Sequence, residues 1–188
     1  MQDKTGQARP APLAYVSPAQ INFEVPAGTA TGSATVMLQK GSSTQNLGTV
    51  RITAAAPALF SANASGSGVA AATAVRVVAP PNVQSPVDVF SCDRSGGCKT
   101  VPIALGVDTP VYISLYGTGI RGRSSLADAS VTIGSVSAPV LYAGPQGKYP
   151  GLDQVNIALP LSLRGGGVVD VTLTVSGQSS NTVQIAVE

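Results

Sequence analysis

The chain contains a gapped internal repeat, whose two copies cover residues 11–52 and 138–187. The matching segments, in order, are Ala11–Tyr15 with Ala138–Tyr142, Gln20–Asn22 with Gln154–Asn156, Pro26 with Pro160, and 45–52 with 179–187. The offset grows from 127 residues at Ala11 to 134 residues at Gln20, so the second copy carries seven extra residues, in "QGKYPGLD". A match of this length, in the same order, predicts two related structural units.

Each copy has the residue pattern of short antiparallel strands. An Ala-Pro turn leads to a strand ending at Tyr, and a proline turn is followed by "QINFEV" or "QVNIAL", whose residues alternate between two faces. Next come "SATVML" or "VDVTLTV", a polar turn, and a last strand, "TVRI" or "TVQIAV". The strand "VDVTLTV" is predicted to be half-buried in a sandwich, because its apolar and polar residues occupy opposite faces. These faces carry Val169, Val171, Leu173 and Val175, and Asp170, Thr172 and Thr174.

The composition is typical of many short strands joined by tight turns. Glycine (21) and proline (14) are spread along the 188 residues, and we find no long segment with apolar residues at helical spacing. We therefore predict an all-β fold of two related immunoglobulin-like β-sandwich units, with antiparallel strands and little or no helix. The predicted parts are a polar N-terminal tail (1–10), a first β repeat without leading strands (11–56), a middle β segment (57–110) and a second β unit (111–188).

The segment "SLYGTGIRGRS" (114–124) contains the spacing G-x-G-x-x-G, which opens dinucleotide-binding loops when it follows a strand. Such a loop must lead into a helix of a dozen or more residues and then into a parallel strand. Here "RSSLADAS" leaves room for at most two turns before "VTIGSV", and the acidic residue expected about twenty positions on is missing. We therefore expect no nucleotide cofactor, and interpret Gly117 and Gly119 as positions where a strand bends or bulges at the edge of a sandwich.

The two cysteines, Cys92 and Cys98, enclose five residues that end in Gly-Gly, between the apolar runs "PVDVF" and "TVPIAL". This pattern predicts a hairpin with a cysteine on each strand, where disulfide geometry can be met. Free thiols are the main alternative, since a zinc site would need two more soft ligands and the chain has no histidine or further cysteine. A disulfide indicates an oxidising compartment, such as the periplasm, the cell surface or the exterior.

Several kinds of chemistry are disfavoured by what the sequence lacks. Without histidine, neither a Ser-His-Asp nor a Cys-His apparatus can exist, and no D-x-D-x-D-G calcium pattern occurs. Carboxylate pairs can hydrolyse glycosides, and Glu24 and Asp153, in the matching "QIN" and "QVN" regions, are the pair to test. They are not equivalent in the repeat, so we interpret the nine acidic residues as solvated surface charges. We predict that the chain is not an enzyme and has no catalytic residues, cofactor or metal.

Charge and hydropathy limit the partners. The net charge of +2 is too small to indicate nucleic acid, and no stretch approaches 18 uninterrupted apolar residues, so no membrane span is expected. Tyr142 and Tyr149 flank the seven-residue insertion and could form a contact patch for sugar or protein, although we favour interior packing with a hydroxyl partner. The start, "MQDKTGQARP", lacks a signal peptide, as in a cytosolic protein or a mature or recloned piece of an exported one.

Five segments carry a resemblance to a family of exported domains. They are "APLAYVSPAQINFEVP", "APALFSANASGSGVAAA", "PVYISLYGTGIRG", "APVLYAGPQGKYPGLDQVNIALP" and "SNTVQIAV". Nearly the whole chain from Ala11 is similar to the acidobacterial family described as the Solibacter uncharacterised C-terminal domain, and residues 111–188 resemble an immunoglobulin-like TIG (IPT) unit. The resemblance implies an extracellular or cell-surface β module, usually at the end of larger proteins, with no established activity.

The two copies differ in what precedes them. The second follows "YGTG" and "VTIGSV", whereas the first begins at Ala11 with no equivalent strands upstream. Either the middle segment covers the first copy, or an unpaired edge is completed by a preceding domain or a neighbouring subunit. We therefore expect a structural or adhesive protein that self-assembles through strand edges into a filament or surface array, with a carbohydrate- or protein-binding accessory module as the alternative. Expected partners are further copies, adjacent domains of a parent protein, or polysaccharide.

Overall fold

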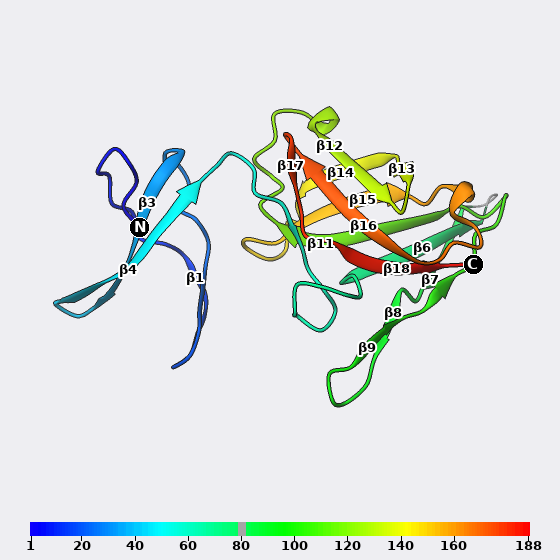
Figure 1. Ribbon diagram of the computed structural model, residues 1–188, viewed down its shortest axis with the longest axis horizontal. Helices are drawn as coiled ribbons and strands as arrows, with labels where there is room; N and C mark the ends of the chain where they lie inside the picture. The colour runs from blue at the N-terminus through cyan, green and yellow to red at the C-terminus, as the bar shows by residue number, and fades with distance from the viewer. Residues whose placement is uncertain (79–81) are drawn as a thin grey trace. The chain divides into compact units, whose positions relative to one another are not determined.

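The computed structural model describes residues 1–78 and 82–188 and consists almost entirely of β-strands (Figure 1). The predicted all-β fold class is confirmed. Among the described residues the paired strands are antiparallel, except that β10 and β18 pair in parallel. The chain divides into unit 1, Met1–Ala54, and unit 2, Ala55–Glu188. Residues 79–81 of the predicted middle segment lie outside the described residues.

Unit 2 is a sandwich of two sheets with six strands each. The first sheet contains, in spatial order, β10 (Pro102–Ile103), β18 (Val183–Val187), β16 (Gly167–Val175), β12 (Ala129–Ile133) and β13 (Val136–Ala138), with β17 (Gln178–Ser179) beside β16. The second contains β14 (Val140–Pro145), β15 (Asp153–Ala158), β11 (Val111–Thr118), β6 (Ala72–Val78) and β7 (Val83–Val87), with β5 (Ala58–Leu59) beside β11. Among the described residues, helical structure is limited to the 3-10 turns η1 (Leu126–Asp128) and η2 (Leu161–Leu163).

A hydrophobic core fills the space between the two sheets of unit 2, because strands of both sheets alternate apolar and polar residues. In β16, Val171, Leu173 and Val175 are fully buried while the threonines between them are partly exposed, as the sequence predicted. In β11, Val111, Ile113 and Leu115 are buried in the same way. The residues of β11 between these positions face the outer side of the second sheet.

The middle segment contributes its strands to unit 2. β6 pairs with β11, β5 pairs with the end of β11 at Gly117 and Thr118, and β10 pairs with β18. The loop after β5 is held by Asn181, whose side-chain amide donates to the carbonyls of Leu59 (2.8 Å) and Gly66 (2.7 Å). The ladders that this segment forms therefore complete the second copy of the repeat.

Unit 1 contains two separate two-stranded sheets. β1 (Leu13–Val16) pairs with β2 (Ile21–Phe23), and β3 (Gly32–Lys40) pairs with β4 (Ser43–Ile52). β4 is longer than the predicted strand "TVRI", because the turn is tight at Gly41 and the ladder runs through a bulge between Val36 and Met37. Within the described residues, neither hairpin of unit 1 belongs to a larger sheet.

The two copies of the repeat have the same strand registers. β1 pairs with β2 as β14 pairs with β15, including the bulge next to the tyrosine. The corresponding pairs are Leu13–Phe23 and Val140–Ile157, Tyr15–Asn22 and Tyr142–Asn156, and Val16–Ile21 and Ala143–Val155. In the second hairpin, Ala34 pairs with Val50 as Val171 pairs with Val183. The repeated sequence therefore produces repeated structure, down to single residue pairs.

The first ten residues, expected as a polar tail, fold onto β3. The backbone amide of Gln2 donates to the Thr35 carbonyl (2.8 Å), and the Gln2 carbonyl accepts from the Thr35 amide (2.7 Å). In unit 2, β12 pairs with β16 through Thr132 and Thr172. Thr172 of β16 corresponds to Thr35 of β3 in the repeat. Gln2 therefore pairs with β3 at one position, on the edge that corresponds to the β16 edge paired with β12.

Asp3 holds this N-terminal segment in place and is a buried carboxylate. It accepts hydrogen bonds from the Thr5 hydroxyl (2.5 Å), the Ala30 amide (3.1 Å) and the Arg9 guanidinium (2.6 Å). The Thr5 hydroxyl first, and then the Ala30 amide, stabilise the charged form and hold the pKa of Asp3 well below its usual range. Its stabilising effect is thus present above the ordinary carboxyl pKa and is lost as the pH falls.

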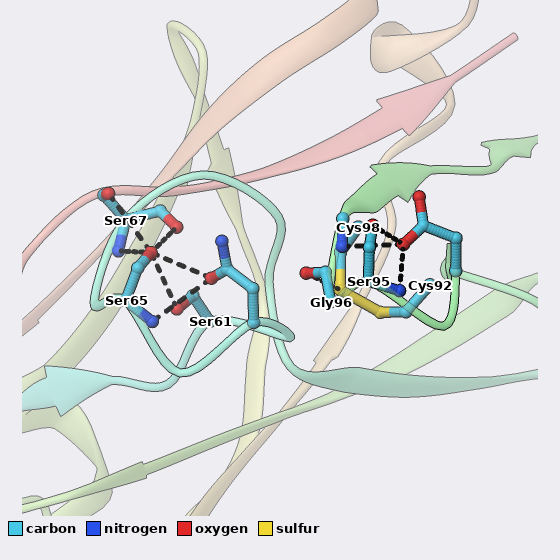
Figure 2. Close-up of a disulfide and its surroundings, with 10 residues drawn as sticks. Ser61, Ser65, Ser67, Cys92, Ser95, Gly96 and Cys98 are labelled. Atoms are coloured by element: carbon cyan, nitrogen blue, oxygen red, sulfur yellow. Dashed lines mark hydrogen bonds between the residues drawn. A yellow bond between two sulfur atoms is a disulfide. The ribbon is translucent and has the colours of Figure 1, made fainter.

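The predicted disulfide between Cys92 and Cys98 is confirmed. The cysteines face each other across the hairpin of β8 (Phe90–Cys92) and β9 (Cys98–Thr100), with their Cα atoms 4.1 Å apart. Figure 2 shows the bond closing the loop that carries Ser95 and Gly96. The loop is also ordered by Asp93, which accepts from the Ser95 hydroxyl (2.5 Å) and the Gly97 amide (3.0 Å).

Removing the disulfide by replacing both cysteines with serine is expected to lower the free energy of unfolding by about 2 kcal/mol, the chain-entropy value for so short a loop. Urea denaturation of the wild type and the double variant measures the difference. Because the Asp93 hydrogen bonds remain, we expect native circular dichroism in the variant. Equal unfolding midpoints would contradict a stabilising role for the bond.

Candidate functional sites

The glycine-rich turn is a point of close backbone approach. A Cβ atom on Gly117 would fall onto the carbonyl oxygen of Ala58, and one on Gly119 onto that of Ala56. Gly119 also has a positive φ of 71°, which favours glycine. The turn leads to η1 and β12. Our placement of these glycines at a sandwich edge was wrong, since β11 lies inside its sheet, between β15 and the strands β5 and β6.

Asp153 organises the rest of this turn. Its carboxylate is completely buried and accepts from the amides of Ile120 (2.7 Å) and Arg121 (3.2 Å) and from Nε of Arg121 (2.6 Å). The interpretation of all acidic residues as solvated surface charges was therefore wrong for Asp153 and for Asp3. At both carboxylates, backbone amides and an arginine supply the hydrogen bonds that water would otherwise make.

The Asp153 position also distinguishes the two repeats. By the offset of the matching "QVN" and "QIN" segments, Asp153 corresponds to Ala19 in unit 1. Within its described residues, unit 1 has no counterpart of β11 and of the glycine-rich turn that follows it, so no carboxylate is needed at this position. Glu24 follows β2 in unit 1, whereas Asp153 is the first residue of β15 in unit 2. Among the described residues, no group of three or more His, Cys, Asp or Glu is placed to hold a metal ion.

Unit 1 exposes apolar side chains at positions that are core positions in unit 2. The corresponding pairs, with exposed fractions, are Val16 (60%) and Ala143 (0%), Phe23 (39%) and Ile157 (0%), Leu38 (37%) and Val175 (0%), and Val50 (42%) and Val183 (0%). In unit 2 these positions are covered because the six-stranded sheet that contains β14 and β15 packs face to face with the six-stranded sheet that contains β16 and β18. Unit 1 therefore keeps the residue pattern of a sandwich core without the strands that would enclose it.

The outer face of the second sheet of unit 2 carries a groove of about 330 Å³. Its walls come from the side-by-side strands β14, β15, β11, β6 and β7 (Figure 1). The register places Tyr142, Asn156, Ser114 and Thr73 in one row across four strands. Sequence reasoning missed this site, although the alternation of "VYISLY" already places Tyr112, Ser114 and Tyr116 on one face.

The two tyrosines singled out in the sequence are both exposed. Tyr142 lies at one end of this row and is 38% exposed, while its hydroxyl donates to the carbonyl of Pro145 (2.5 Å). Tyr149 is 56% exposed, with the Lys148 ammonium 5.4 Å from its ring centre. The favoured interpretation of interior packing was therefore wrong for both rings, although Tyr142 has the expected hydroxyl partner. Of the two, Tyr142 lines the groove.

Comparisons with protein-family models, with curated proteins and with solved structures give no match to this chain. In addition, the described part of the chain contains no helix with the length and apolarity needed to cross a membrane.

Proposed function

We propose that the chain is an exported, non-enzymatic structural or adhesive protein that assembles with further copies of itself through unit 1. The observation that carries the proposal is the exposure, in unit 1, of residues whose counterparts form the core of unit 2. Contiguous exposed apolar surface marks sites of protein–protein interaction. The Cys92–Cys98 disulfide supports an oxidising compartment, and the resemblance to acidobacterial exported β modules with TIG-like units supports the same location.

A second copy is the partner favoured by strand geometry. The edge of β2 that corresponds to the β11-paired edge of β15 has no ladder within the described residues. Antiparallel pairing makes such an edge complementary to itself about a two-fold axis, so no other protein is required. The small net charge of +2 also opposes association only weakly. Joining copies through this edge and the exposed apolar residues of unit 1 would give dimers, or filaments if the contact does not close into a ring.

Replacing Val50 with aspartate is expected to weaken self-association about a hundredfold or more, because burying an unpaired carboxylate costs several kcal/mol. The matched control is Thr49→Asp, which places the same charge on the opposite face of β4 and should leave association intact. Sedimentation over a range of concentrations, with electron microscopy of the wild type, measures the effect.

The Val50→Asp variant could lose self-association only because β4 unfolds locally. A second variant, Phe23→Lys on β2, tests this case, because it should weaken self-association by the same factor without changing β4. Circular dichroism checks that each variant keeps its strands. A wild type that remains monomeric at every concentration contradicts self-assembly, as does a Val50→Asp variant that associates as well as Thr49→Asp.

A further inference from the structure

The groove on the outer face of the second sheet of unit 2 has side chains suited to an uncharged, hydroxyl-rich ligand. Among the described residues, its lining combines hydroxyl, amide and aromatic groups with aliphatic ones and includes no Asp, Glu, Lys or Arg. The polar and aromatic members are Thr73, Gln84, Tyr112, Ser114, Tyr142 and Asn156. Because charged ligands are normally met by opposite charges, this lining disfavours phosphates, acidic sugars and nucleic acid.

The central polar group of the groove is the Asn156 amide. Its oxygen accepts from the Ser114 hydroxyl (2.9 Å) and from the side-chain amide of Gln154 (2.6 Å). These bonds fix the orientation of the amide, and its NH₂ group makes no hydrogen bond within the described residues. An oriented donor beside an exposed tyrosine ring provides one polar and one apolar contact at fixed positions.

The same surface residues recur in the first repeat. In unit 1 the side-chain amide of Gln20 donates to the Asn22 oxygen at 2.6 Å, the distance found for Gln154 and Asn156, and Tyr15 pairs with Asn22 as Tyr142 pairs with Asn156. These side chains do not belong to the hydrophobic core, so core packing does not account for their presence in both copies. Their recurrence indicates a shared surface role.

We propose that this groove binds a neutral oligosaccharide, as a segment of a polysaccharide chain. A sugar ring presents C–H groups on its faces and hydroxyls around its rim, which match the tyrosine rings and the row of amide and hydroxyl groups. The volume of about 330 Å³ lies at the lower end of the range for ligand pockets, about 300–1,000 Å³, and suits a short segment. The site uses residues of unit 2 alone and is independent of assembly through unit 1.

Affinity electrophoresis of the full chain tests the proposal, with native gels that contain one soluble polysaccharide each. Neutral probes are xyloglucan, galactomannan, mixed-linkage β-glucan and hydroxyethylcellulose, and charged probes are alginate and heparin. We expect at least one neutral probe to retard the protein and the charged probes to have no effect. Retardation by no neutral probe, or equal retardation by the charged probes, overturns the proposal.

Variants locate the binding to the groove. Tyr142→Ala and Asn156→Ala should each weaken retardation about tenfold, as expected for central contacts. Tyr142→Phe should retain binding, because the Tyr142 hydroxyl is already used by Pro145. Tyr149→Ala, outside the groove lining, is the matched control and should bind like the wild type. Gln84 also lines the groove but is exposed, so Gln84→Ala should weaken retardation without unfolding the protein. It replaces Asn156→Ala if that variant does not fold. Unchanged retardation of folded Tyr142→Ala and Gln84→Ala overturns the proposal.

Discussion

Replacing Gly119 with alanine is expected to lower the free energy of unfolding by about 3 kcal/mol or more. Two costs add at this position. The positive φ of 71° costs a residue with a Cβ about 1 kcal/mol, and the new Cβ meets the carbonyl oxygen of Ala56. That carbonyl cannot move away freely, since the Ala56 amide is bonded to the Gly119 carbonyl (3.0 Å). Overpacking of this kind costs about 1–3 kcal/mol.

Two other glycines separate the costs and act as matched controls. Gly177 has a φ of 77° but no atom within 4 Å of its Cβ position, so Gly177→Ala should lose only about 1 kcal/mol. Gly117 has no positive φ, but its Cβ would meet the Ala58 carbonyl, so Gly117→Ala isolates the steric cost. Urea denaturation followed by circular dichroism ranks the three variants. If Gly119→Ala proves no worse than Gly177→Ala, close backbone approach is not the reason for glycine here.

The repeat was the part of the fold that the sequence predicted best. Matched residues such as Tyr15 and Tyr142 occupy identical registers, because alternation and proline positions together specify which residues face the core. The disulfide was equally predictable, since two cysteines that flank a short hairpin loop have few other partners. The nucleotide-loop interpretation was rejected on segment length and on the missing acidic residue, and in the structure the turn leads through η1 to β12.

The remaining features depend on contacts between segments far apart in the chain. Asp153 is buried because the amides of Ile120 and Arg121, more than thirty residues earlier, point at it, and no local pattern encodes this. β11 is an interior strand because β5 and β6 pair with it, and the residue pattern of a strand does not show which other strands become its neighbours. The alternation of apolar residues in unit 1 is the same whether or not a partner covers them, so their exposure could not be read from the sequence.

Replacing Asp153 with alanine is the second change expected to have a large effect, with a loss of about 3 kcal/mol in the free energy of unfolding. The variant leaves the buried Ile120 amide without its acceptor and removes the carboxylate that accepts from Nε of Arg121, whose Nη2 still donates to the Leu152 carbonyl (3.0 Å). An unsatisfied buried donor costs about 1–3 kcal/mol, and breaking a buried ion pair costs about 3–5 kcal/mol. Because the Arg121 side chain is 36% exposed and can regain water, the lower part of this range applies.

Asp153→Asn should fall between the wild type and the alanine variant, since its amide oxygen can still accept one of the two backbone amides. The matched control is Asp170→Ala, at an exposed carboxylate bonded to Gln184, which should change stability by no more than about 0.5 kcal/mol. If Asp153 were a catalytic carboxylate, its removal would raise the free energy of unfolding, because removing a strained active-site charge usually stabilises a protein. An Asp153→Ala variant as stable as the wild type, or more stable, would therefore reject the structural role and return this residue to the candidates for chemistry.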